Sequence, residues 1–235
     1  MKYIKNYWLL IQVVCTTIAL PTIFHAIGDI SILENYSQLI NRHILYQFVT
    51  LILAIVMLLV YQSSRKAVFV HYFRRGNSKQ EILSEPYVGI RPKAQEKWSR
   101  AGVKWALVLS VVTAIVLYFH LDIDAPPSIE KVISLLPIIL LFAFVNSFVE
   151  EVISRLGVIV ALKGVYKDRT IAIISGILFG SVHYFGTPGG VFGVLLASFL
   201  GWFLAKSILE TKGIFWAWCI HFLLDVIIMT FLFIQ

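Results

Sequence analysis

The stretch Ser147-Phe-Val-Glu-Glu-Val-Ile-Ser-Arg155 decides the fold, because it places three charged groups inside an apolar segment that runs from about residue 133 past residue 160. Each charge at the centre of a membrane helix costs about 2.5–3.5 kcal/mol on insertion scales. Glu151 and Arg155 are four residues apart, so on a helix they share a face and can neutralise each other. Glu150 then lies about 100° round the helix, without a partner in its own segment. An unpaired carboxylate at this depth is a candidate for chemistry.

The composition is that of an integral membrane protein. Of the 235 residues, 59% are hydrophobic and 14% are charged, whereas globular domains have about 45–50% apolar and about 25% charged residues. A transmembrane helix needs about 20 mainly apolar residues. About seven spans are predicted, at residues 8–27, 43–62, 103–120, 131–162, 170–185, 191–209 and 214–234. The predicted fold class is therefore an all-α, polytopic membrane helical bundle.

The basic residues that give the chain its formal charge of +7 gather in the longest polar stretch, residues 63–102. Lys- and Arg-rich loops beside membrane spans lie on the cytoplasmic side. The expected partner of this loop is the lipid bilayer, and nucleic acid is not expected. Counting spans from the loop predicts a multi-pass protein of the cell membrane, with the N-terminus in the cytoplasm and the C-terminus outside.

Two later spans also carry ionisable groups at membrane depth. His183 lies in the fifth predicted span, and His221 and Asp225 lie one helical turn apart on one face of the seventh. Glu150, His183 and Asp225 therefore come from three different helices, and each can face the bundle interior. A single group of this kind is as often a satisfied polar bridge between helices as a functional one. Three of them in one half of a small chain favour a functional site.

The remaining histidines carry a weaker signal. His25 and Asp29 repeat the same four-residue spacing at the end of the first span, but no acidic cluster accompanies them. We interpret this pair as a coincidence. His43, His71 and His120 lie at span ends or in the basic stretch, and we expect no role for them in the site.

Two carboxylates and two histidines in a water-poor bundle suit the hydrolysis of a peptide bond. A buried glutamate can take a proton from water while a histidine orients that water. A second histidine can donate to the oxyanion that forms on the attacked carbonyl. Side chains of these types also bind zinc, in which case Glu150, His183 and His221 are the expected ligands. The sequence contains neither a His-Glu-x-x-His motif nor a Gly-x-Ser-Gly motif, so zincin-type and rhomboid-type sites are not indicated.

Three motifs on successive predicted helices carry a family resemblance: Glu150-Glu151-Val-Ile-Ser-Arg155, Phe179-Gly-Ser-Val-His183 and His221-Phe-Leu-Leu-Asp225. Together they resemble the CPBP family of CAAX proteases and bacteriocin-processing enzymes, also known as the Abi family, over about residues 136–228. The resemblance implies an all-helical bundle with a conical cavity open toward the cytoplasm and the membrane. It also implies a water-activating base at Glu150, assisted by His183, and an oxyanion site formed by His221 and Asp225.

The same resemblance assigns Arg155 the role of holding Glu151. Members of the family have been described as metalloproteases, but a metal-free glutamate mechanism fits the prenyl-processing branch better, so no cofactor is expected here. That branch usually has Asn where this chain has Asp225. The whole chain is predicted to form one integral membrane domain, with N-terminal helices and the basic loop in residues 1–130 and the catalytic core in residues 131–235.

The predicted function is an intramembrane endopeptidase of bacterial type, which cleaves a peptide or membrane-protein substrate such as a bacteriocin or pheromone precursor. A prenylated CAAX substrate is the second choice, because a short chain with Asp225 resembles the bacterial branch more closely. The alternative is a non-catalytic scaffold, such as a bacteriocin-immunity protein or a partner of a sensor kinase. Against it, Glu150, His183 and His221 are costly groups that a scaffold has little reason to keep. A transporter is favoured less, because the sequence shows no related halves.

Overall fold

The computed structural model of this chain describes residues 2–121 and 128–234, and in these residues the architecture is all-helical. The predicted fold class is confirmed. The helices are α1 (Lys2–Ala26), α2 (Gln38–Tyr72), α3 (Trp98–His120), α4 (Ile129–Glu150), α5 (Gly157–Leu162), α6 (Asp168–Val182), α7 (Gly190–Thr211) and α8 (Phe215–Phe233). Shorter turns are 3-10 helical at η1 (Pro86–Val88) and η3 (His183–Phe185) and π-helical at η2 (Glu151–Leu156).

Within the described residues, six helices are long and apolar enough to cross a membrane. They are α1, α2, α3, the continuous helix formed by α4, η2 and α5, and then α7 and α8. The fifth predicted span, residues 170–185, is represented by α6, which has 15 residues and a length of about 22 Å at 1.5 Å per residue. It ends early because the chain enters η3 and then the glycine- and proline-rich turn of residues 186–190.

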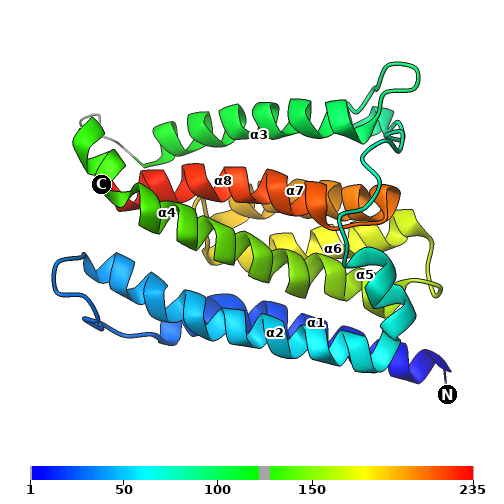
Figure 1. Ribbon diagram of the computed structural model, residues 1–235, viewed down its shortest axis with the longest axis horizontal. Helices are drawn as coiled ribbons and strands as arrows, with labels where there is room; N and C mark the ends of the chain where they lie inside the picture. Colours follow the sequence, from blue (N-terminus) through cyan, green and yellow to red (C-terminus); the bar gives the residue numbers. More distant parts are fainter. Residues whose placement is uncertain (1, 122–127, 235) are drawn as a thin grey trace.

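When α6 is counted between the α4–η2–α5 helix and α7, successive helices run in alternating directions, so the N-terminus and the C-terminus lie at opposite ends of the bundle (Figure 1). We call the end with the loop of residues 73–97 the basic end; the links 163–167 and 212–214 also lie there. We call the opposite end, where residues 27–37 connect α1 to α2 and where α8 finishes, the distal end. This alternation agrees with an odd number of crossings.

The basic loop is shorter than the predicted range of residues 63–102, because α2 and α3 both extend into it and leave residues 73–97 between them. Arg65 interrupts α2 with non-helical backbone angles (φ −142°, ψ 48°). Its guanidinium donates to the carbonyls of Ala161 and Lys163, at 2.9 and 2.7 Å. These bonds satisfy carbonyls at the end of α5 that have no partner inside their own helix. They also hold the extension of α2 against the bundle.

The loop is fastened across the connection between α7 and α8. The Glu210 carboxylate accepts from Trp98 Nε1 at 2.8 Å and from the backbone N–H of Leu83 at 3.2 Å. Gly213 lies so close to the loop that a Cβ built there sits 2.3 Å from the backbone nitrogen of Gly76. Only a residue without a side chain allows this approach. The loop is therefore packed against the bundle.

Every residue of the segment 152–162 is buried. This segment contacts α1, α2 and α6. Close packing depends on Gly157, where an added Cβ meets the Tyr61 hydroxyl at 2.3 Å. The charged stretch of residues 147–155 thus begins beside the cavity described below, and the chain after it continues into the buried core.

Candidate active site

Glu151 is the buried anchor of the site. Its Oε1 atom lies 3.3 Å from Arg155 Nε, and both side chains are 0% exposed, so the predicted ion pair is present. The same oxygen lies 2.8 Å from Nδ1 of His221, which comes from α8. Since a carboxylate accepts, Nδ1 carries the proton and the other ring nitrogen, Nε2, is left for the site. Both charged residues belong to the π-helical turn η2, a feature that often occurs at functional sites.

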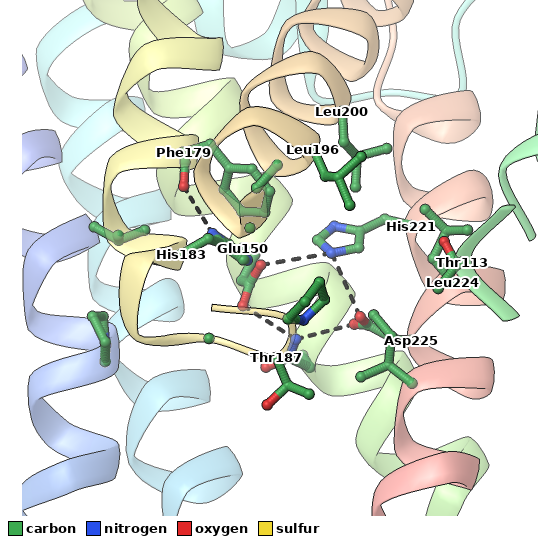
Figure 2. Close-up of a pocket in the computed structure, with 18 of the residues that line it drawn as sticks. Thr113, Glu150, Phe179, His183, Thr187, Leu196, Leu200, His221, Leu224 and Asp225 are labelled. Atoms are coloured by element: carbon green, nitrogen blue, oxygen red, sulfur yellow. Dashed lines mark hydrogen bonds and ion pairs between the residues drawn. The ribbon is translucent and has the colours of Figure 1, made fainter. Parts of the chain in front are cut away.

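Glu150 is the carboxylate that faces open space. Its side chain is 14% exposed, compared with 0% for Glu151, and it lines a cavity in the bundle. One oxygen, Oε2, lies 3.6 Å from His221 Nε2 (Figure 2). The other, Oε1, accepts from Asn146 Nδ2 at 3.2 Å. Glu150 is therefore contacted by His221 and Asn146 and still remains accessible from the cavity.

Asn146 forms hydrogen bonds with both Glu150 of α4 and Asp225 of α8. Its amide nitrogen donates to Glu150 and also to Asp225 Oδ2, the latter at 3.0 Å. Asp225 Oδ1 lies 3.6 Å from His221 Nε2 (Figure 2). The amide oxygen of Asn146 accepts from Gln47 Nε2 at 3.5 Å. Asn146 is not among the residues predicted from the sequence, although its place one helical turn before Glu150 inside an apolar segment is a usable signal.

Phe179, the first residue of its motif, packs its ring against the buried Arg155. The guanidinium of Arg155 lies 3.3 Å from the centroid of the Phe179 ring, a favourable place for a cation. The backbone carbonyl of Phe179 accepts from His183 Nδ1 at 2.8 Å, so His183 Nε2 is the ring nitrogen that remains available (Figure 2). The tight packing of α6 on α7 supports this placement, because a Cβ at Gly180 meets Ser198 Oγ at 1.9 Å.

The cavity has a volume of about 580 Å³, and it is lined by four of the predicted site residues: Glu150, His183, His221 and Asp225. Arg155 and Glu151 are not among its lining residues. Most of the wall is apolar and comes from several helices: Leu20 and Phe24 of α1, Val112 and Val116 of α3, Leu196 and Leu200 of α7, and Leu224 and Leu232 of α8. A cavity of this size falls in the range of sites that enclose a ligand. It can accept an apolar segment with its polar backbone directed at the carboxylates.

His25 and His43, for which no role in the site is expected from the sequence, also line this cavity. Asp29, in contrast, lies 3.4 Å from Arg42. The side chain of His43 donates from Nδ1 to the carbonyl of Leu39, at 2.8 Å. The sequence did not indicate these positions, because the hairpin of α1 and α2 reaches the site only through tertiary packing.

In the parts of the chain that the structure describes, no three His, Cys, Asp or Glu side chains converge closely enough to hold a metal ion. Glu150, His183 and His221, the expected zinc ligands, line one cavity without forming such a group. The Nδ1 atom of His221 is bonded to Glu151 and that of His183 to a backbone carbonyl, so the other ring nitrogen of each histidine, Nε2, is the one left for the cavity.

A comparison with models of protein families matches part of this chain. The family model described as "Type II CAAX prenyl endopeptidase Rce1-like" matches residues 132–227. No curated protein and no solved structure matches the chain. The matched range includes all six predicted site residues and Asn146, and the match confirms the resemblance inferred from the three motifs. It supports a CAAX-type protease and leaves the N-terminal helices outside the comparison.

Proposed function

We propose that this chain, whose residues 132–227 match the Rce1-like CAAX endopeptidases, is an intramembrane endopeptidase that hydrolyses a peptide bond with water activated by Glu150. The observation that best supports this is the meeting of Glu150, His221 and Asp225 at one wall of a largely apolar cavity, with 3.6 Å between His221 Nε2 and each carboxylate. The proposed substrate is a peptide or membrane-associated segment that enters this cavity.

Glu150 is the proposed general base. It is the more accessible of the two adjacent carboxylates, and the Asn146 amide orients it from behind. His183 presents Nε2 to the same cavity, because its Nδ1 donates to the Phe179 carbonyl. A water molecule between Glu150 and His183 loses a proton to Glu150 as its oxygen forms a bond to the substrate carbonyl carbon. The C–N bond then breaks, and the proton passes from Glu150 to the leaving amine.

His221 is the proposed oxyanion donor. Its ring is held by the Glu151 carboxylate, which in turn is paired with Arg155. In its protonated form, His221 donates from Nε2 into the space between Glu150 and Asp225. Preorganised donors of this kind, when removed, cost about 10²–10³-fold in turnover in other enzymes that form an oxyanion. Glu151 and Arg155 are positioning residues, since they reach the cavity only through His221 and Phe179.

Comparative peptidomics tests the proposal. Membranes from cells that carry wild type, Glu150→Gln or Glu130→Gln are compared for peptides with newly formed termini. Glu130 is a matched control, because it is an exposed glutamate at the start of the same helix, α4. We expect products in wild type and Glu130→Gln that are absent in Glu150→Gln. Identical peptide sets in all three samples would refute the peptidase.

The Asp225→Asn substitution separates two ways in which this position can act. A protonated Asp225 can donate to the oxyanion, whereas an ionised carboxylate has no proton to give. An asparagine there keeps an oxygen for the Asn146 amide and supplies an uncharged NH2 donor in place of the carboxyl O–H. We therefore expect most activity to remain and to extend to higher pH, because an amide does not lose its donor as pH rises. The measurement is a pH–rate profile of both purified proteins in nanodiscs, and a loss of about 100-fold at every pH would exclude the donor role.

A further inference from the structure

The cavity extends from the site toward the distal end of the bundle. Its lining includes side chains at the helix ends there, namely His25 in the last turn of α1, Leu39 in the first turn of α2 and Leu232 in the last turn of α8. The turn that follows His183 also contributes, and its Phe185 side chain is 71% exposed. The cavity therefore has a mouth at the distal end, which we define by His25, Leu39, Phe185 and Leu232.

Toward the basic end the cavity stops inside the bundle. Its lining residues nearest that end include Trp105, about two turns into α3, and Ser154, which precedes the fully buried residues 155–162. The packing beyond is dense, since a Cβ at Gly102 meets the ring of Trp216 at 2.3 Å. The indole of Trp216 donates to Ser78 Oγ of the basic loop at 3.1 Å. Among the described residues, the loop and α8 thus close this end.

The charges indicate which end faces the cytoplasm. Nearly all Lys and Arg residues belong to the basic end, whereas Arg42 and Lys131 are the two near the distal end, where Asp29, Glu34 and Glu130 accompany them. Such an excess of basic residues marks the cytoplasmic side. This orientation places the N-terminus in the cytoplasm and the C-terminus outside. The mouth of the cavity then lies on the non-cytoplasmic side.

We propose that the substrate reaches Glu150 from the non-cytoplasmic face, as an apolar peptide segment held in the outer leaflet. This proposal rests on the proposed function and differs from the family resemblance, which implies a cavity open to the cytoplasm. We expect an apolar substrate because most of the residues that line the cavity are apolar. Val108 and Val112 of α3 line the cavity and are each 43% exposed, so α3 presents apolar side chains to a segment that enters it.

Site-directed labelling tests the orientation of the mouth. In a chain whose two cysteines, Cys15 and Cys219, are replaced by Ala, single cysteines are introduced as Phe185→Cys, Glu34→Cys and Tyr87→Cys. Glu34 is exposed at the distal end, and Tyr87 is 93% exposed in the basic loop. A membrane-impermeant sulfonated maleimide is applied to intact and to permeabilised cells. We expect Phe185→Cys and Glu34→Cys to react in intact cells, and Tyr87→Cys to react only after permeabilisation.

A functional measurement accompanies the labelling. Reaction of Phe185→Cys with the maleimide in intact cells is expected to remove the Glu150-dependent peptides, because the adduct fills the mouth. The same reaction at Glu34→Cys is expected to leave them, since Glu34 is not a lining residue of the cavity. Labelling of Phe185→Cys only after permeabilisation, or under neither condition, would overturn access from outside. Absence of Glu150-dependent peptides together with the expected labelling would instead refute the peptidase and leave the open mouth intact.

Discussion

Glu150→Gln is expected to lower turnover by at least about 100-fold, because an amide cannot take a proton from water. The substitution keeps the size of the side chain and an oxygen that can accept from Asn146. Membrane insertion and thermal stability should therefore be unchanged. The measurement is single-turnover cleavage of a substrate identified by peptidomics, with purified protein in nanodiscs. Glu130→Gln, at the exposed start of the same helix, should match wild type.

His183→Ala is expected to cause a similar loss of turnover, because the proposed attacking water between Glu150 and His183 then has no histidine to orient it. The double variant Glu150→Gln with His183→Ala should be little worse than either single variant, since residues that act as a unit have non-additive effects. Multiplicative losses in the double variant would indicate that the two residues act independently. Full activity in Glu150→Gln would exclude Glu150 as the base.

Arg155→Ala is expected to prevent normal accumulation of the protein. Glu151 would then remain at 0% exposure without its cation, and breaking a buried ion pair in this way costs about 3–5 kcal/mol. The loss of the guanidinium also removes the cation from the face of Phe179. Protein level in membranes and thermal unfolding in detergent measure the effect. A wild-type level and melting temperature for Arg155→Ala would contradict a stabilising role for the pair.

A double substitution separates support from chemistry. Glu151→Gln with Arg155→Met removes both charges, keeps an oxygen that can accept from His221 Nδ1, and retains a side chain over the Phe179 ring. Stability is expected to return at least in part, because replacing a buried ion pair by uncharged groups is often neutral. Stability no better than that of Arg155→Ala would show that charge removal does not explain the defect.

Several features followed from the sequence alone, and all of them depend on short-range periodicity. Apolar runs of about 20 residues identified six of the long helices. The spacing of four between Glu151 and Arg155, and between His221 and Asp225, placed each pair on one helix face, and both pairs are in contact. The extents of α6 and of the basic loop were less accurate, because turn chemistry and contacts with α5 decide where those helices end.

The tertiary structure alone decided how these helices meet. Glu151 and His221 are 70 residues apart in the chain, and Asn146 and Asp225 are 79 apart, so no local pattern predicts that they bond. The extent of the cavity likewise depends on the loop that covers the basic end and on the α1–α2 hairpin, whose His25 and Leu39 line the cavity near the distal end. Residue types and helical spacing therefore determined which groups are candidates for the site. Packing between distant helices determined which of them face the cavity and which hold the others in place.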